Sequence, residues 1–167
     1  MFWILILGIS TGMRTMTAMA VLCWFMWLAL LPVTSLNYWT ANAIAAMVFT
    51  VFALGEYYVD TLAKTPSRKS LGPLLARVVF GVLVGVLVIS SFEEPLAGGV
   101  ILGVGGVLIG AFGGYSVRMY LARLVGRDFP IAVGESALAL ALSVVALHFI
   151  GIDIVRQAHE AMLKISF

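Results

Sequence analysis

The chain has 167 residues, of which 62% are hydrophobic and 11% are charged, and its mean hydropathy is +1.10. Water-soluble domains contain about 45–50% apolar and about 25% charged residues, so this composition excludes a soluble fold and indicates a membrane protein. The net charge of +2 is too small and too scattered for nucleic-acid binding, and membrane lipid is the expected partner. Short connections separate the apolar segments, which predicts one transmembrane domain over residues 1–167.

The first apolar segment covers residues 2–31 and is longer than the roughly 20 residues that a straight helix needs to cross a bilayer. It is interrupted by the run Gly8-Ile9-Ser10-Thr11-Gly12-Met13-Arg14. We therefore expect one crossing with a break or kink near residues 8–14. Pro32 and Asn37 mark the turn that follows it.

The later apolar segments are each long enough for one crossing. They cover residues 41–62, 73–90, 96–125 and 131–150. With the first segment they predict an all-α polytopic membrane helix bundle of about five transmembrane helices.

The remaining residues, 152–167, are too few and too charged to cross. Apolar residues recur there at helical spacing, namely Val155, Ala158, Met162 and Ile165. This pattern predicts an amphipathic helix at the membrane surface, and the alternative is a loosely ordered tail.

Basic residues gather beside two of the connections. Lys64, Arg68, Lys69 and Arg77 flank the connection between the second and third spans, and Arg123 and Arg127 flank that between the fourth and fifth. Because positive residues favour the cytoplasmic side, both connections should face the cytoplasm. Five crossings then place the N-terminus in the cytoplasm and the C-terminal helix on the outer surface.

A stripe of glycines follows one face of the fourth span. Its members are Gly99, Gly103, Gly106, Gly110 and Gly114, and Gly81 and Gly85 repeat the spacing in the third span. Missing side chains let another helix backbone approach closely, so we expect the stripe to be a helix-packing face. The alternative is a groove that faces a ligand.

Two glycine-rich runs each precede an arginine, Gly8 to Arg14 in the first span and Gly110 to Arg118 in the fourth. With five crossings these spans run in opposite directions, which is the layout of an inverted repeat with broken helices. Arg14 and the amides around Gly12 would then hold an anion. The alternative is that both arginines anchor at lipid head groups or neutralise acids.

Two carboxylates, Glu56 and Asp60, lie four residues apart on one face of the second span. By depth they should meet Arg118 and Glu135, because paired charges are the least costly in a low dielectric. Tyr57, Tyr58, Tyr115 and Tyr120 are candidates for a hydrogen-bonded lining. The cluster is either an ion-pair knot or the polar end of a pathway.

No catalytic or metal-binding constellation is evident. His148 and His159 do not have metal-ligand spacing, and no serine lies in a nucleophile elbow. Cys23 lies in an apolar run and is interpreted as a packing residue. We expect no enzyme activity, no metal and no cofactor.

One block of the sequence resembles a known family. The block is Gly55-Glu56-x-x-x-Asp60-x-x-x-Lys64-Thr65-Pro66-Ser67-Arg68, and Thr11 to Thr17 and Gly113 to Arg118 are similar to the same family. It is the bacterial membrane family called domain of unknown function 4126. The resemblance implies a small multi-span protein of the bacterial inner membrane and brings no established activity.

The first functional hypothesis is a small transporter or channel for a small or anionic solute. Its route would be lined by Arg14, Glu56, Asp60, Arg118 and Glu135. The glycine face would support a homo-oligomer. The alternative is a structural or accessory subunit of a larger membrane complex, in which that face binds a partner helix.

Overall fold

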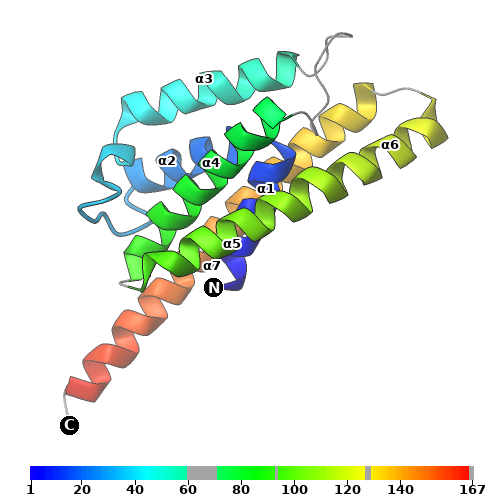
Figure 1. Cartoon of the computed structure of the whole chain (residues 1–167). Coiled ribbons are helices and arrows are strands. Elements are labelled where there is room, and N and C mark those ends of the chain that lie inside the picture. The colour runs from blue at the N-terminus through cyan, green and yellow to red at the C-terminus, as the bar shows by residue number, and fades with distance from the viewer. Residues whose placement is uncertain (60–70, 93, 127–128, 166–167) are drawn as a thin grey trace.

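The computed structural model describes residues 1–59, 71–92, 94–126 and 129–165 (Figure 1). These ranges fold into helices and contain no strand, which confirms the all-helical class. Within these ranges, three helices are long and apolar enough to cross a membrane, namely Leu71–Phe92, Leu96–Val125 and Phe129–Lys164.

The break expected in the first apolar segment is present, but it follows the glycines. Helix α1 covers Phe2–Met13 and α2 covers Thr17–Trp27. Arg14 lies between them in extended conformation, with φ −139° and ψ 110°. Gly8 and Gly12 lie inside α1 and do not break it. Their missing side chains permit a close helix contact that is described below.

Helices α1 and α2 form a hairpin beside α7, which covers Phe129–Ile165. Trp3 near the start of α1 stacks on Phe149 with ring centroids 4.5 Å apart, whereas Arg14 at its end bonds to Ala132. After α2 the chain lies again beside the part of α7 that Trp3 contacts. A Cβ on Gly151, two residues after Phe149, would lie 3.3 Å from the Leu30 carbonyl oxygen. The expectation that residues 2–31 make one crossing is therefore wrong. At about 1.5 Å per residue, neither α1 nor α2 reaches the roughly 30 Å that a crossing requires.

The bundle thus has two ends, which we name the Arg14 end and the Trp3 end. Helix α3 (Ala43–Val59) rises antiparallel to α2, since Thr17 bonds to Tyr57 and Trp24 bonds to Thr50. Helix α4 (Leu71–Ile89) returns to the Trp3 end, followed by the short turn η2 (Ser90–Phe92). Helices α5 (Leu96–Leu108) and α6 (Gly114–Val125) then run from the Trp3 end to the Arg14 end, and α7 runs back to the Trp3 end.

The hairpin also changes where the N-terminus lies. Trp3 is at the end of the bundle where α4 finishes and α5 begins, whereas Arg77 and Arg123 lie toward the opposite end. The expectation that the N-terminus shares a side with the basic connections is therefore wrong. The expectation assumed that residues 2–31 cross once and so end on the opposite side. A hairpin instead returns the chain to the side from which it started.

The hydrophobic core lies where α1, α2, α4 and α7 meet. Its fully buried members include Leu7, Met19, Leu22, Val88 and Leu147. Cys23 is buried in the same core, as expected of a packing residue.

The glycine stripe is confirmed as a helix-packing face within the chain. Gly99 and Gly103 of α5 contact Gly85 and Gly81 of α4, and Gly106 and Gly110 contact Gly8 and Gly12 of α1. These contacts join backbone to backbone, which only residues without Cβ permit. The four glycines are consequently not available to a second chain, and Gly110 and Gly114 also border a hollow.

The same contacts show that α1 and α5 run parallel, because Gly106 meets Gly8 and Gly110 meets Gly12 one turn further on. The inverted relation expected between the two glycine–arginine runs is therefore wrong. The second run is also unbroken: Ile109–Gly113 (η3) is a π-helical turn inside the continuous helix Leu96–Val125. The two runs are the two faces of one helix contact.

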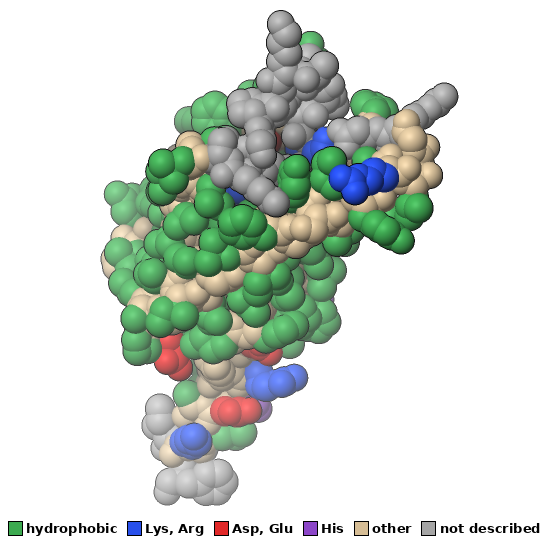
Figure 2. Space-filling model, turned by 45° about the vertical axis from the view of Figure 1, so that its right-hand side comes forward, with side chains coloured by type: hydrophobic (Ala, Val, Ile, Leu, Met, Phe, Trp, Pro, Cys, Tyr) green, Lys and Arg blue, Asp and Glu red, His purple; other side chains and the backbone are tan. Residues whose placement is uncertain are grey.

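Helix α7 continues through the residues expected to form a separate surface helix. It has 37 residues and no interruption at Gly151. Gly costs about 1 kcal/mol in a helix interior but does not break it as Pro does. Figure 1 shows the last turns of α7 projecting from the bundle, and Figure 2 shows charged side chains at the two ends of an apolar body.

Asn37 organises the connection from α2 to α3, as its place in the sequence indicated. Its side chain is fully buried and donates to the Leu87 carbonyl (3.4 Å) and to Ser91 Oγ (3.0 Å). Its side-chain oxygen Oδ1 accepts a hydrogen bond from the Thr34 amide at 2.6 Å. This one amide therefore ties the connection to the end of α4.

We expect Asn37→Ala to lower the free energy of unfolding by about 2–3 kcal/mol, because it leaves buried partners without hydrogen bonds. For a chain of this size this corresponds to a fall in Tm of roughly 5–10 °C in detergent micelles. Asn42→Ala is the matched control, because the side chain of exposed Asn42 accepts a local hydrogen bond from the Ile44 amide. Equal Tm values for the two variants would contradict the role given to Asn37.

Candidate functional site

Arg14 occupies the tip of the α1–α2 hairpin and is only 2% exposed. Its Nη2 donates to the carbonyl oxygen of Ala132 on α7 at 3.1 Å. Its guanidinium carbon lies 5.3 Å from the centre of the Tyr57 ring, within the range of a cation–π contact. Three helices thus hold one cation inside an apolar bundle.

Glu56 of α3 binds the backbone at the same tip. Its two carboxylate oxygens accept from the amides of Thr15 (2.9 Å) and Met16 (3.0 Å). The first amides of a helix lack partners within it, and the positive end of the helix dipole favours a carboxylate there. Gly12, whose neighbouring amides were expected to hold an anion, lies inside helix α1, and the amides that bind a carboxylate here are those of residues 15 and 16.

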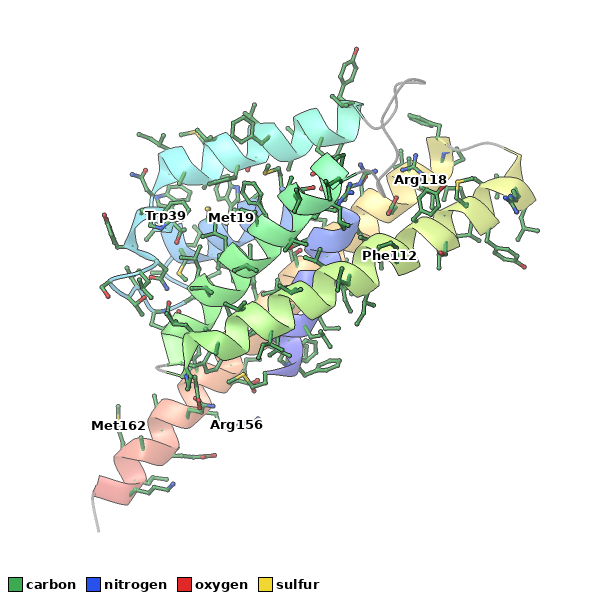
Figure 3. The ribbon with its side chains drawn as sticks, viewed as in Figure 1. Met19, Trp39, Phe112, Arg118, Arg156 and Met162 are labelled. Atoms are coloured by element: carbon green, nitrogen blue, oxygen red, sulfur yellow. The ribbon has the colours of Figure 1, made fainter. Side chains whose placement is uncertain are left out.

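Arg118 and Glu135 form an ion pair between α6 and α7. The Nη1 and Oε2 atoms are 3.5 Å apart, and the side chains are 11% and 6% exposed. Figure 3 shows Arg118 on α6 near the first turns of α7, whereas Phe112 lies on the outer side of the π-helical turn. Of the four charges expected to form one cluster, Arg118 and Glu135 are in contact.

The charges gather at the Arg14 end in two groups rather than one. Ala132, which binds Arg14, is one helical turn from Glu135, which binds Arg118. Glu56 belongs with Arg14 and caps the backbone instead of joining the ion pair. Asp60 lies outside the described residues.

A hollow of about 340 Å³ opens beside Arg14. Its polar lining comes from Arg14, Tyr57, Tyr58 and Ser136, and its apolar lining includes Phe129. The sequence pointed to the two tyrosines, but Ser136 was missed, because one serine in an apolar helix carries no signal of its own. Tyr120 is 65% exposed and does not contribute.

A second hollow of about 500 Å³ lies on the other side of the first turns of α7. It is enclosed by α1, by η3 with α6, and by α7, and Arg118 and Glu135 line it. Most of its wall is apolar. Ala132 lines the first hollow and Glu135 the second, so α7 separates them.

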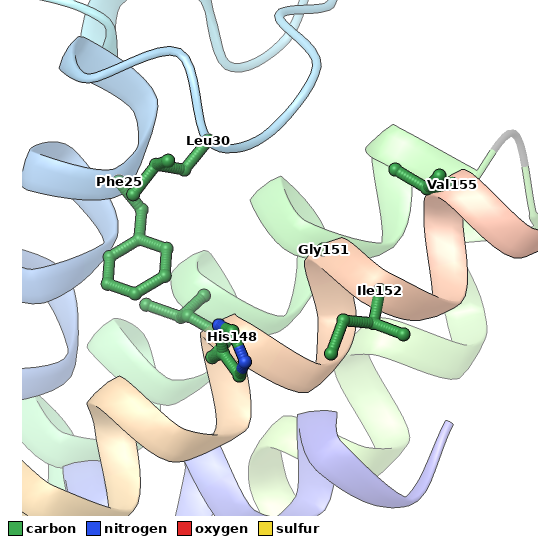
Figure 4. Close-up of a pocket in the computed structure, with 7 residues that line it drawn as sticks. Phe25, Leu30, His148, Gly151, Ile152 and Val155 are labelled. Carbon is green, nitrogen blue, oxygen red and sulfur yellow. The ribbon is translucent and has the colours of Figure 1, made fainter.

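A third hollow of about 300 Å³ lies at the Trp3 end, between the end of α2 and α7 (Figure 4). His148 is the titratable side chain in it, surrounded by apolar residues such as Phe25 and Ile152. Among residues 1–59, 71–92, 94–126 and 129–165, no three histidine, cysteine or acidic side chains are grouped as metal ligands. This hollow offers no evident chemistry.

Sequence reasoning also missed a polar contact between α1 and α7. Ser10 Oγ lies 2.7 Å from Ser143 Oγ and donates to the Ala139 carbonyl at 2.8 Å. Small residues that bond across helices are a common way to join helices in lipid. This contact fixes α1 against α7 and so helps to hold the hairpin tip in place.

No family model, curated protein or solved structure matches this chain. The resemblance to domain of unknown function 4126 stays a prediction. What the site does is therefore inferred from its geometry and charge.

Proposed function

We propose that the protein is a small membrane transporter or channel for a small anionic solute. The observation that carries the proposal is the hairpin tip, where buried Arg14, a helix N-terminus and a hollow meet inside an apolar bundle. A buried charge is costly in a membrane protein and is usually retained for a pathway or a binding site. Irregular backbone at membrane depth is likewise tolerated where it lines a cavity.

In the proposed membrane arrangement, α3 crosses together with the three longer helices. Its 17 residues extend about 25 Å, close to the thickness of the hydrocarbon core. Four crossings and the α1–α2 hairpin then replace the five spans expected from the sequence. In this proposal the membrane is the bacterial inner membrane, and the positive residues at the Arg14 end favour the cytoplasm for that end and the outer side for both termini.

Glu56 suggests how an anion would be held. Its carboxylate binds two amides at the positive end of α2, and the ring of the next residue, Tyr57, lies beneath the Arg14 guanidinium. A solute anion that reaches the hollow would meet the Arg14 guanidinium, which lines it, and the two amides belong to the residues that follow Arg14 in the chain. We propose that the solute exchanges with Glu56 at this place, so that the carboxylate closes the route when no solute occupies it.

We expect Glu56→Gln to raise anion flux at least threefold. The carboxamide is neutral and has one acceptor oxygen, so it competes less well than a carboxylate for the two amides. Osmotic shrinkage of proteoliposomes in chloride, nitrate or phosphate salts, with a potassium ionophore, measures the flux. Glu160→Gln is the matched control, because Glu160 is exposed on the projecting part of α7.

The result that would overturn the proposal is a permeability no higher than that of protein-free liposomes, for wild type and Glu56→Gln with all three anions. Faster flux in the control as well would show that the change is not specific to the hairpin tip. Circular dichroism and elution from gel filtration establish that each variant is folded.

The alternative of an accessory subunit loses one of its supports, since four glycines of the stripe are already packed within the chain. A homo-oligomer or a partner subunit would have to use another surface. Co-purification in mild detergent with one reproducible heterologous partner, together with absent flux, would favour this alternative.

A further inference from the structure

The hollow of about 500 Å³ between α1, α6 and α7 has the size and lining of a ligand site. Sites for small molecules measure about 300–1,000 Å³ and combine an apolar wall with a few polar groups. Here the apolar wall includes Ile9, Leu138 and Leu142, and the polar groups are Arg118 and Glu135. The enclosing helices include the two longest candidate membrane spans, so the hollow lies where lipid is the medium.

Glycines widen this hollow without serving a helix contact. A Cβ on Gly113 or Gly134 would meet nothing within 4 Å, in contrast to the packed glycines of the stripe. Both line the hollow. The missing side chains at Gly113 and Gly134 therefore leave open space in the hollow and do not permit a close helix contact.

One end of the hollow carries both a positive and a negative side chain. Arg118 and Glu135 carry opposite charges, lie 3.5 Å apart and both face the hollow. An anionic amphiphile would place like charge beside Glu135, and a cationic one beside Arg118. A head group with a phosphate and an ammonium complements both charges and adds no net charge to a poorly solvated place.

We propose that this hollow binds one acyl chain of a zwitterionic aminophospholipid. The acyl chain lies along α7 from Glu135 toward Leu142, a distance of about 10 Å along the helix. The phosphate binds the Arg118 guanidinium, and the primary ammonium binds the Glu135 carboxylate. The site lies across α7 from Arg14 and does not depend on the proposed transport function.

Photo-crosslinking tests whether the hollow is occupied. Phosphatidylethanolamine with a diazirine in its acyl chain is mixed into vesicles that contain the purified protein, and the labelled residues are mapped by mass spectrometry. We expect label to concentrate on residues 109–121 and 131–142. Gly134→Leu should reduce this label at least fivefold, because the new side chain fills the hollow.

Gly55→Leu is the matched control, since a Cβ on Gly55 also meets nothing within 4 Å but belongs to the exposed face of α3. It should leave the label on α6 and α7 unchanged. Label of equal intensity on α3, α6 and α7 that Gly134→Leu does not change would overturn the site.

The head group is tested with the same acyl diazirine on phosphatidylethanolamine, phosphatidylglycerol and phosphatidylcholine. We expect phosphatidylethanolamine to label the hollow at least threefold more than the other two lipids. The double variant Arg118→Gln and Glu135→Gln, which removes both charges and leaves two neutral polar side chains, should remove this difference. Equal labelling by all three lipids in the wild type would overturn the head-group assignment.

Discussion

Gly110→Leu is expected to prevent the bundle from folding, with a loss of more than about 4 kcal/mol in the free energy of unfolding. A Cβ on Gly110 would overlap the carbonyl oxygen of Ile9 and would lie 2.9 Å from its carbonyl carbon. These atoms belong to the backbone of α1 and cannot move aside as a flexible side chain does. Helix α1 would have to leave α5, and the hairpin would lose its support.

The yield of monodisperse protein in detergent and its Tm measure this effect. Gly113→Leu is the matched control, because it lies in the same π-helical turn and a Cβ there meets nothing within 4 Å. Its Tm should stay within about 3 °C of the wild type, corresponding to roughly 1 kcal/mol. A Gly110→Leu variant that purifies with the wild-type Tm would refute the close contact between α1 and α5.

Arg14→Met should reduce anion flux about 10- to 100-fold. Methionine fills part of the same space but removes the buried cation and its bond to Ala132. A hydrogen bond to a charged group contributes about 1.5–3 kcal/mol, which corresponds to that range in affinity. The measurement is the proteoliposome assay described above, with Tm recorded for each variant.

Two further variants separate charge from folding. Arg123→Met removes an exposed arginine in the last turn of α6 and should leave the flux unchanged. Arg14→Lys keeps the charge and should restore part of the flux lost in Arg14→Met. Wild-type flux in a folded Arg14→Met protein would exclude this residue from the route.

Hydropathy was sufficient to identify the helical membrane-like class, and local composition was sufficient to locate the break beside Arg14. The spacing of Gly99, Gly103, Gly106 and Gly110 also identified a packing face correctly. These properties depend on short stretches of chain. The identity of the facing helices depends on the whole topology, and the sequence pattern did not contain it.

The charged residues illustrate the same division. The cost of isolated charges in lipid predicted one cluster of charges, and Arg118 and Glu135 of that cluster are in contact. The same reasoning placed Glu56 with them, but Glu56 binds two amides at the hairpin tip. A break creates unpaired amides, and these competed for the carboxylate. That competitor exists only once α3 lies beside the break.

By itself the sequence determined that this chain folds into helices apolar enough to cross a membrane, where the first long segment breaks, and which glycines permit close contact. Tertiary structure alone decided that α1 and α2 form a hairpin, that α1 runs parallel to α5, and that α7 continues through Gly151. The physical reason is that transfer into lipid depends on the local content of apolar side chains, whereas the direction of a helix depends on the backbones against which it packs.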